Sequence, residues 1–302
     1  DLLELLLLLL KAAAPLVTVI ISSYNHAPYV EASILSVIGQ TYPNVELLVI
    51  DDGSSDDSVE RIRRLQATHG FDFRVQQNKG LTRTLNEAIA RARGELIAPF
   101  GSDDIMLPHR LATQVEYMAD KPEVGICAGN IELMRADGTP YPESKQRRDI
   151  PFRRIDFEAL FADRHLFPPA PTLLIRREAL EKVGGFNPEI RLEDLYIELK
   201  IMNAGYYIDI LGVALARYRK HDTNTYKNLR FMTDSILRIY EDYADHPGYT
   251  EAKMRLLDSM FAKSATRDRK LARELLRQIP LRYWTRKTLR GLLRYVFSRP
   301  AS

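Results

Sequence analysis

Glu95-Leu-Ile-Ala-Pro-Phe-Gly-Ser-Asp103-Asp104 is the stretch of this chain that decides its fold class. Its apolar half predicts a short strand, which ends in a glycine turn followed at once by two carboxylates. Carboxylates that follow a buried strand lie where open α/β sheets bind their ligands. Two neighbouring negative charges repel each other, which favours a site that takes up a cation. Taken alone, the same residues also fit a polar turn that caps a helix starting near Leu107.

Strand-like and helix-like segments alternate on both sides of this stretch. The predicted strands are residues 17–21, 46–50, 73–76, 95–100, 124–127, 172–175 and 206–218. The predicted helices between the first strands are residues 29–39, 55–68, 80–93 and 108–120. Such alternation is typical of βαβ units and predicts an α/β fold, with a mostly parallel central sheet and helices on both faces.

The chain divides into three parts on this pattern. Residues 15–225 form the α/β domain, and residues 226–302 show only helical spacing, which predicts a C-terminal helical appendage with helices over 231–243, 252–261 and 271–279. Residues 1–14 are rich in leucine but too short to span a bilayer, and they lack the basic start of a signal peptide. We interpret them as a remnant of expression or a fortuitous helix and leave them out of the fold.

Composition and charge point to a globular protein with a basic tail. Apolar residues make up 45% of the chain and charged residues 27%, which is enough for a core. From Arg267 onward there are 11 Lys/Arg and two acids, whereas the preceding residues have 32 Lys/Arg and 38 Asp/Glu. This asymmetry suggests an anionic surface as partner. The single cysteine, Cys127, excludes an internal disulfide, fits a reducing cytoplasm and lies in an apolar segment typical of a core thiol.

Polar residues also follow the first two predicted strands. Ser22-Ser-Tyr24-Asn25 offers hydroxyls and an aromatic ring to a base and a ribose, although Asn25 also fits an ordinary helix cap. Asp51-Asp52-Gly-Ser-Ser-Asp56 offers a carboxylate that can accept a hydrogen bond from a uracil or guanine N–H. Ser54, Ser55 and Asp56 fit helix N-caps as well, but the acidic doublet exceeds what capping requires.

Two later segments carry further candidates. Gly184-Gly-Phe-Asn-Pro188 precedes a predicted helix that begins near Glu193-Asp194. An acid in that position complements the helix dipole or, as Asp194, faces a cleft as a general base. His221 lies among polar residues at the end of the last predicted strand, which favours a ligand over a buried structural histidine.

In this order, these segments resemble the inverting family 2 glycosyltransferases with the GT-A fold, of the bacterial polysaccharide or O-antigen type. The resemblance covers about Pro15 to Thr225 and also rests on Asn78-Lys-Gly80-Leu-Thr-Arg-Thr-Leu-Asn86. It implies a hexosyltransferase-like enzyme that uses a nucleotide-sugar donor, a UDP-sugar first of all. The implied acceptor is a hydroxyl of a glycan or lipid-linked molecule in cell-surface polysaccharide synthesis, such as that of lipopolysaccharide.

The resemblance also implies roles for individual residues. Asp194 matches the catalytic base, Asp104 the metal-binding acid, and His221 a late histidine that completes the metal shell. Asp103 matches a residue that serves both ribose and metal, and Asp52 the acid that reads the base. The residues expected to bind the donor are Ser22, Tyr24, Asn25, Asp52, Asn78, Gly80, Arg83 and Asp103. The implied cofactor is Mn²⁺ or Mg²⁺, and an imidazole ligand favours Mn²⁺.

The chain departs from the family pattern at two positions. Ser102 stands where the first acid of the metal motif is expected, so Asp104 must carry most of the coordination. Leu85 stands where many relatives have arginine, so Arg83 either covers a phosphate or lies on a solvated helix face. One base without a second nucleophilic carboxylate implies a single displacement with inversion.

Two other functions compete with this interpretation. A nucleotidyltransferase would show a Gly-rich basic phosphate loop near the first strand, which Ser22–Pro28 is not. A non-catalytic module could bind a nucleotide sugar or a nucleic acid, but the chain lacks an interleaved aromatic platform and its body is acidic. We therefore expect no nucleic acid partner.

The C-terminal segment suggests where in the cell the protein acts. Pro280 is predicted to start a last helix, which runs to Phe297 with arginines between its apolar positions. The apolar positions are Leu281, Trp284, Leu289, Leu292, Leu293 and Val296. A basic amphipathic helix suits an anionic membrane, which would make the protein peripheral on the inner face of the cell membrane. The same pattern also fits a packed helix whose apolar stripe covers the domain.

Overall fold

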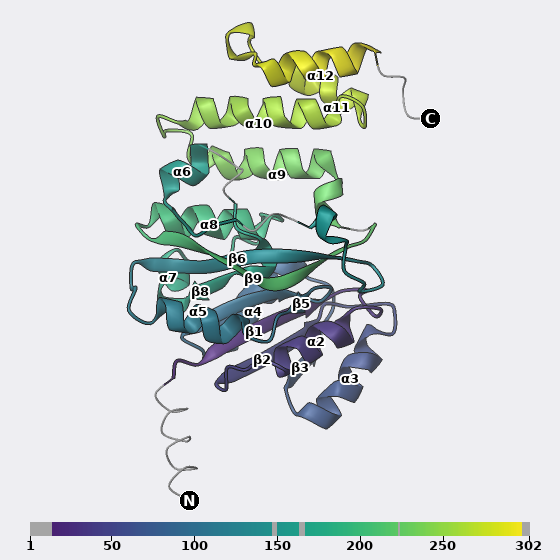
Figure 1. Cartoon of the computed structure of the whole chain (residues 1–302), viewed down its shortest axis with the longest axis vertical. Helices are drawn as coiled ribbons and strands as arrows, with labels where there is room; N and C mark the ends of the chain where they lie inside the picture. The colour runs from purple at the N-terminus through teal and green to yellow at the C-terminus, as the bar shows by residue number, and fades with distance from the viewer. Residues whose placement is uncertain (1–13, 147–149, 163–166, 223, 298–302) are drawn as a thin grey trace, which may run out of the picture. The chain divides into compact units, whose positions relative to one another are not determined.

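The computed structural model describes residues 14–146, 150–162, 167–222 and 224–297. The predicted segment 1–14 therefore lies, except for its last residue, outside the described residues. The chain divides into two compact units, the first comprising residues 1–157 and 166–221, the second residues 158–165 and 222–302. Figure 1 labels most helices and strands of both units.

The first unit holds the sheet and the helices around it. Its strands are β1 (Val17–Ser23), β2 (Val45–Asp51), β3 (Asp72–Val75), β4 (Leu96–Gly101), β5 (Ile105–Met106), β6 (Val124–Arg135), β7 (Arg153–Ile155), β8 (Leu174–Arg176) and β9 (Tyr207–Lys220). Its helices are α2 (Val30–Ile38), α3 (Ser58–His69), α4 (Leu81–Arg91), α5 (Arg110–Met118), α7 (Arg177–Lys182) and α8 (Glu193–Asn203). The α/β alternation predicted from the sequence is confirmed.

Among the described residues, nine strands form one sheet in the order β3-β2-β1-β4-β8-β6-β9-β5, with β7 also paired to β9. The half made of β3, β2, β1 and β4 is parallel. Strand β8 then runs antiparallel to both β4 and β6, and β5 and β7 run antiparallel to β9. The sheet is thus parallel where the first predicted site segments lie and mixed elsewhere.

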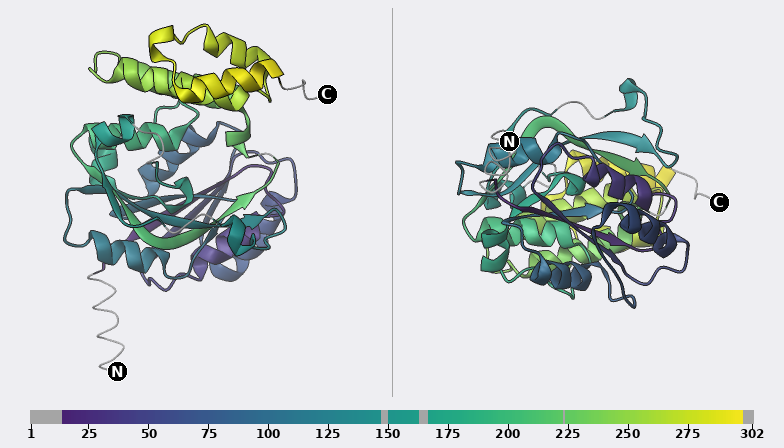
Figure 2. Two further views of the ribbon diagram at one scale, coloured as in Figure 1. Left: turned by 45° about the horizontal axis from the view of Figure 1, so that its top comes forward. Right: turned by 90° about the horizontal axis from the view of Figure 1, so that it is seen from below.

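Helices cover both faces of this sheet, as Figure 2 shows. Val17, Val19 and Ile21 of β1 point to a buried cluster that also contains residues of α2, α3 and α5. Ile20, on the opposite face of the same strand, is also fully buried, and α4 contacts β1 and β2. A strand buried on both faces explains why its sequence is a continuous apolar run instead of an alternating one.

Two predicted strands differ from the structure. The predicted strand 124–127 extends as β6 to Arg135, because its partner β9 continues alongside it as far as Lys220. The predicted strand 172–175 begins later: Ala170–Thr172 forms a 3-10 turn (η3), and β8 starts at Leu174. Strand length is set by the partner strand, which the local pattern does not contain.

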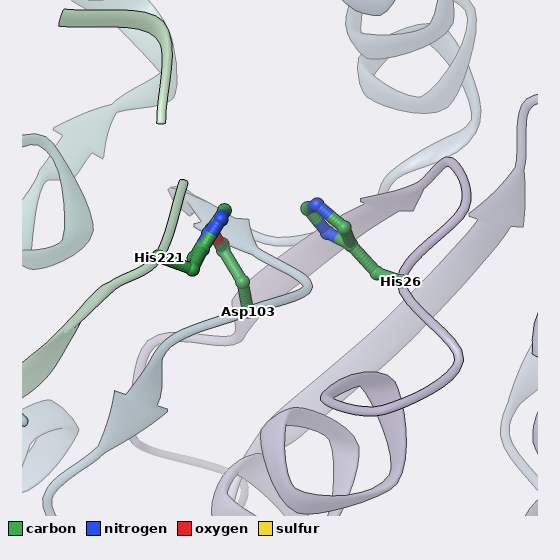
Figure 3. Close-up of side chains that lie close together, drawn as sticks. All are labelled: His26, Asp103 and His221. Atoms are coloured by element: carbon green, nitrogen blue, oxygen red, sulfur yellow. The ribbon is translucent and has the colours of Figure 1, made fainter. Parts of the chain in front are cut away.

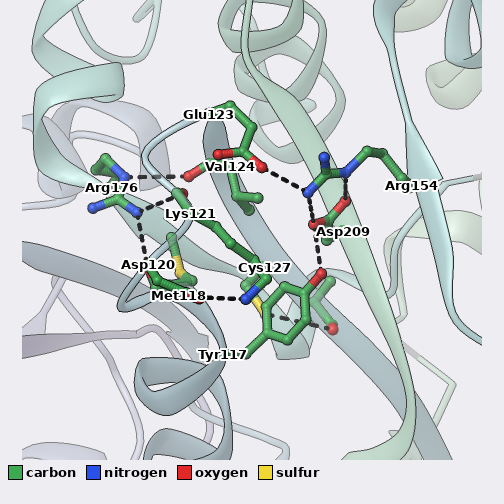
Figure 4. A network of polar contacts seen from close by, with 11 residues as sticks. Tyr117, Met118, Asp120, Lys121, Glu123, Val124, Cys127, Arg154, Arg176 and Asp209 are labelled. Atoms are coloured by element: carbon green, nitrogen blue, oxygen red, sulfur yellow. Dashed lines mark hydrogen bonds and ion pairs between the residues drawn. The ribbon is translucent and has the colours of Figure 1, made fainter.

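An ion pair between Arg154 and the buried Asp209 links β7 to β9 in the first unit (Figure 4). Arg154 donates two hydrogen bonds to the carboxylate of Asp209, at 2.9 and 2.8 Å, and one to Glu123 at 3.0 Å. The hydroxyl of Tyr117 donates to the same Asp209 carboxylate at 2.8 Å. Burial and this carboxylate raise the pKa of Tyr117 to about 12, so the phenol stays protonated.

The second unit is helical in its described residues. Its elements are α6 (Phe157–Ala162, from Glu158 on), η4 (Thr225–Lys227), α9 (Leu229–Glu241), α10 (Tyr249–Ser264), α11 (Arg269–Leu276), η5 (Leu281–Tyr283) and α12 (Arg286–Phe297). Phe161 packs edge-on against the rings of Tyr240 and Tyr243, which joins α6 to the end of α9. The predicted helical appendage is confirmed for these residues.

The last helix begins later than the sequence predicts. It starts at Arg286 instead of Pro280, because the 3-10 turn η5 and an extended Trp284 intervene. Asp258 of α10 accepts hydrogen bonds from the hydroxyls of Thr285 and Thr288 at 2.7 and 2.6 Å, which fixes the start of α12. Gly291 packs on α10, since a Cβ there would lie 2.9 Å from the ring of Phe261.

No helix in the described part of the chain has both the length and the hydrophobicity needed to cross a membrane.

Candidate functional site

Three of the predicted site segments meet at one edge of the parallel half of the sheet. Ser22 of β1 lies in register with Ile50 of β2 and with Gly101 of β4. The residues that follow these strands therefore share one edge, because the strands run in the same direction. This edge carries the carboxylates and imidazoles described below.

The loops after β1 and β2 hold each other in place. Asn25 has a positive φ of 53°, and its side-chain oxygen accepts hydrogen bonds from the N–H and hydroxyl of Ser55 at 2.8 and 3.2 Å. The N–H of Asn25 donates to the Ser54 hydroxyl at 2.8 Å. The structure thus gives Asn25 a role in loop geometry, while the neighbouring Tyr24 keeps half of its side chain exposed.

Asp52 organises the loop that leads into α4. Its carboxylate accepts hydrogen bonds from the Gln76 side chain at 2.8 Å, the Lys79 N–H at 2.9 Å and the Gly80 N–H at 2.9 Å. Gly80 has a φ of 84°, a conformation that favours glycine. Three donors satisfy most of what one carboxylate accepts, which leaves one acceptor position for a ligand.

Asp103 and two histidines form the closest cluster at this edge (Figure 3). The Nε2 atom of His221 lies 2.8 Å from Oδ2 of Asp103. The Nδ1 atom of His26 lies 2.7 Å from the hydroxyl of Ser102, and its ring meets the ring of His221 edge-on at 5.9 Å. One ligand atom from each of His26, Asp103 and His221 lies within 4.8 Å of the others, close enough to hold one metal ion.

Asp104 is bound to the end of β9. Its Oδ1 accepts a hydrogen bond from the backbone N–H of Arg219 at 2.8 Å, and the Arg219 side chain donates to the carbonyl oxygen of Asp103 at 2.6 Å. A Cβ added to Gly101 would lie 2.7 Å from Oδ1 of Asp103 and 3.3 Å from Oδ2 of Asp104. Both carboxylates therefore border Gly101, and only glycine leaves them this space.

The pKa values of the two adjacent carboxyl groups are shifted in opposite directions. Burial tends to raise the pKa of Asp103, but the hydrogen bond and charge of His221 and the charge of His26 bring it below its usual value. Burial and the neighbouring Asp103 raise the pKa of Asp104 well above its usual value. Burial also lowers the pKa of His26. A cation at this edge would reduce the repulsion between the two carboxylates.

Three acids gather at the start of α8. Glu193 and Asp194 stand in its first turn, and Glu198 follows one turn later with only 2% of its surface exposed. Burial and the charge of Asp194 raise the pKa of Glu193 to about 8. Asp194 has its Oδ1 2.8 Å from the N–H of Leu195. The predicted base, Asp194, thus lies in the first turn of α8 near Glu193 and Glu198, and the environment of both glutamates favours their neutral form.

Asn86 anchors the glycine-rich segment that precedes α8. Its side-chain amide donates to the carbonyl of Phe186 at 2.7 Å and accepts from the Phe186 N–H at 3.0 Å. Arg83, one turn earlier on α4, lies exposed and forms an ion pair with Glu189 at 3.6 Å. Asn78 is exposed in the loop held by Asp52. The roles of Arg83 and Asn78 in donor binding stay predictions.

Sequence reasoning missed His26 and Arg219. His26 follows Ser-Ser-Tyr-Asn directly, so its place in a polar loop after β1 was a signal available in the sequence. Arg219 directly follows the predicted strand 206–218, and its guanidinium lies 4.9 Å from the ring centre of Tyr29. Its contact with Asp103 depends on the pairing of β5 with β9, which local sequence does not reveal.

Comparison with known sequences identifies the family. A model described as glycosyl transferase family 2 matches residues 18–184. An uncharacterized glycosyltransferase of Nostoc sp. is 32% identical over 177 residues, which cover 57% of this chain and 54% of that protein. The chain thus spans about half the length of that relative. The O-antigen biosynthesis glycosyltransferase WbnJ of Escherichia coli is 29% identical over 220 residues, covering 70% of this chain and 83% of that one.

Solved structures share the fold at low sequence identity. Residues 1–349 of S. aureus TarS, in complex with UDP-GlcNAc, give a TM-score of 0.66 at 17% identity, covering 89% of this chain and 82% of that one. The mannosyltransferase PcManGT of Pyrobaculum calidifontis, in complex with GDP-Man and Mn²⁺, gives 0.63 at 19% identity, covering 96% and 89%. The GT-A fold predicted from the sequence is confirmed.

Proposed function

The chain belongs to glycosyl transferase family 2, and we propose that it transfers a sugar, with inversion, from a nucleotide-sugar donor to a hydroxyl of a glycan or lipid-linked acceptor in cell-surface polysaccharide synthesis. The relative WbnJ, named for O-antigen biosynthesis, supports the acceptor class. The TarS and PcManGT complexes with UDP-GlcNAc and GDP-Man support the donor class.

The observation that carries this proposal is the cluster of Asp103, His221 and His26 at the carboxyl ends of parallel strands. This is the edge at which open α/β sheets bind ligands. The nearby Asp52 retains an acceptor position for a base, and the exposed Tyr24 offers a ring to it. Together these groups suit the nucleotide half of a sugar donor.

The residues of the cluster fit a divalent cation. One carboxylate oxygen and two imidazole nitrogens favour Mn²⁺ over Mg²⁺, because Mg²⁺ prefers oxygen ligands alone. Asp103, His221 and His26 would hold the ion, and Asp104, whose carboxylate also borders Gly101, would be a further ligand. When bound, the ion supplies positive charge that stabilises the leaving diphosphate.

Asp194 is proposed as the general base. It would accept the proton of the acceptor hydroxyl as that oxygen attacks the anomeric carbon from the side opposite the diphosphate. A positioned base contributes about 10²–10⁴-fold to a rate. Glu193, whose pKa burial and the charge of Asp194 raise to about 8, would keep its proton at neutral pH. Burial also raises the pKa of Glu198, so Asp194 is the carboxylate of the three that is proposed to take a proton.

A donor screen tests the proposed reaction class. The full chain would be incubated with UDP-, GDP- and dTDP-sugars, each with and without Mn²⁺, and both thermal stabilisation and release of nucleoside diphosphate would be measured. We expect one nucleotide class to stabilise the protein only with Mn²⁺ and to be slowly hydrolysed. If no nucleotide sugar stabilises the protein under any condition, the donor assignment is wrong.

The base assignment is tested by a matched pair of variants. Asp194→Asn should abolish transfer, by about 10²-fold or more, while donor binding survives. Glu193→Gln resembles the neutral form that Glu193 already adopts below pH 8, so it should retain most of the activity. Wild-type turnover in Asp194→Asn, or equal losses in both variants, would remove Asp194 from this role.

The metal ligands are tested by calorimetry of Mn²⁺ with the nucleoside diphosphate selected in the screen. Asp103→Asn, His221→Asn and Asp104→Ala should each weaken metal-dependent binding at least tenfold. His26→Asn tests whether His26 binds the metal itself. A similar loss of metal-dependent affinity would make His26 a ligand, whereas an unchanged affinity would place it outside the metal shell. Lys227→Ala, which removes an exposed ion pair with Asp222, serves as the control.

A further inference from the structure

Helices α9, α10 and α12 of the second unit enclose a groove of about 570 Å³ that we call the basic groove. Its cationic residues are Lys263, Arg267, Lys287, Arg290 and Arg294. Its floor is apolar and includes Leu229, Met232 and Met260, and none of the lining residues is acidic. The groove thus combines strong positive charge with an apolar base.

Three of these cations have their charge available. Within the described residues, Arg267, Arg290 and Arg294 form no ion pair with an acidic side chain. Some other arginines of the second unit do form ion pairs, such as Arg230 with Glu274 at 2.8 Å and Arg255 with Glu251 at 2.9 Å. Unneutralised cations gathered around one groove favour an anionic ligand.

Helix α12 also exposes a row of apolar side chains that we call the apolar stripe. It consists of Leu289, Leu293, Val296 and Phe297, with exposed fractions of 51%, 59%, 58% and 79%. Leu289, Leu293 and Phe297 follow one another at spacings of four, and Val296 lies three residues after Leu293, so the four side chains share one side of the helix. Within the second unit, the residues of α12 that are buried are Thr288 and Gly291, which do not belong to the stripe.

The helix therefore has three sectors. Thr288 and Gly291 face α10, where Asp258 and Phe261 hold them. Lys287, Arg290 and Arg294 line the basic groove on the next sector, and the apolar stripe occupies the third. Exposed apolar side chains beside unpaired arginines are the arrangement of a helix that lies in the plane of a membrane.

We propose that this face binds an anionic phospholipid bilayer, with headgroup phosphates in the basic groove and the apolar stripe inserted among the acyl chains. A groove for a free phosphate would not require the apolar stripe. A surface for RNA would stack bases on aromatic rings, whereas three of the four stripe residues are aliphatic. Like charges on its groove oppose the same face of a second copy. The inference adds a partner to the proposed function and does not rest on sugar transfer.

The test is flotation of the full chain with vesicles of phosphatidylcholine alone or mixed with phosphatidylglycerol. We expect binding to the anionic vesicles only, decreasing as salt is raised from 50 to about 500 mM. Arg290→Gln combined with Arg294→Gln should lower the partition coefficient by on the order of tenfold or more. Leu293→Ser should lower it severalfold without changing its dependence on salt.

Matched controls separate this face from general charge and hydrophobicity. Arg63→Gln with Arg64→Gln removes two exposed arginines from α3, and Leu35→Ser removes an exposed leucine from α2. Both should float like the wild type. Phe297→Trp should show a blue-shifted additional emission with anionic vesicles, which reports insertion of the stripe directly.

Several outcomes would overturn the proposal. They are equal flotation with neutral and anionic vesicles, wild-type flotation of the folded arginine variant, and complete release by millimolar inorganic phosphate, which would indicate a free-phosphate site. Binding of single-stranded RNA without vesicle binding would assign the groove to nucleic acid. Donor hydrolysis is measured on the same samples, so a failure of the enzymatic proposal is recognised separately.

Discussion

Glu198 shows how one residue can link the site to stability. It is 2% exposed on α8, and burial, followed by the charges of Asp194 and Glu193, raises its pKa well above the usual value. In the unfolded chain the same group ionises near pH 4.5. Its contribution to folding is therefore most favourable below that pH and is lost as the pH rises, because only the unfolded state gains from ionisation.

Glu198→Gln should therefore stabilise the protein at neutral pH. We expect a Tm increase on the order of 2–5 °C at pH 7.5 and little change at pH 4.5, measured by calorimetry. Glu178→Gln on α7, an exposed position, is the control and should leave Tm unchanged at both values. A Tm gain that is independent of pH would contradict the proposed ionisation.

At the scale of single residues, the cluster of Asp103, His221 and His26 could be predicted only in part. Asp103 and His221 were predicted from their positions after strands, and the structure places them 2.8 Å apart. His26 was not predicted, although it directly follows Asn25. A histidine in a loop can be recognised as a possible ligand only when the residues near it in space are known. The ligand role of Asp104 stays a prediction, with its carboxylate bordering Gly101 and bound to the Arg219 N–H.

At the scale of elements, one ion pair adds to the backbone pairing of β7 with β9. Asp209 is fully buried, and its carboxylate accepts hydrogen bonds from Arg154 and Tyr117. Arg154→Ala would leave this carboxylate with one donor, and we expect a loss of about 2–3 kcal/mol. This is below the value for a fully buried pair because the Arg154 side chain is 37% exposed.

The measurement for this pair is urea unfolding of Arg154→Ala beside Arg217→Ala. Arg217 pairs with Glu132 across β9 and β6 with both side chains over 40% exposed, so its removal should cost at most about 1 kcal/mol. Similar losses in the two variants would mean that the burial of Asp209 does not decide the cost.

The docking of α12 on α10 depends on a glycine. A Cβ at Gly291 would lie 2.9 Å from Phe261 and 3.3 Å from Ala262. Gly291→Val should destabilise the second unit by about 1–3 kcal/mol through overpacking, visible as an earlier unfolding transition of that unit. Arg286→Val, at an exposed position of the same helix, controls for helix propensity and should cost well under half as much.

At the scale of the whole molecule, the two compact units should unfold separately. The only tryptophan of the chain, Trp284, belongs to the second unit, so its fluorescence reports that unit alone. Circular dichroism reports both units. We expect the two signals to give different urea midpoints, because each unit has its own buried residues.

A donor nucleotide with Mn²⁺ should shift only one of these transitions. The proposed ligands Asp103, His221 and His26 all lie in the first unit. Ligand at 100 times its Kd stabilises that unit by about 2.7 kcal/mol, which should move the circular dichroism transition but not the Trp284 transition. Equal shifts in both signals would show that the units unfold as one.

The sequence by itself determined the α/β alternation of the first half of the chain, the GT-A class and the strand ends that carry Asp52, Asp103 and His221. It could do so because period and turn chemistry are local, and because several short motifs in order constrain one another. The tertiary structure alone decided the length of β6, the late start of α12, the place of His26 beside Asp103 and the outward side of the apolar stripe. Each of these depends on a partner distant in sequence. The partners are β9 for β6, Asp258 for the start of α12, β4 and β9 for the cluster of Asp103 and the two histidines, and Phe261 against Gly291 for the stripe. A helical pattern tells which residues share a side, but only packing decides which side is buried.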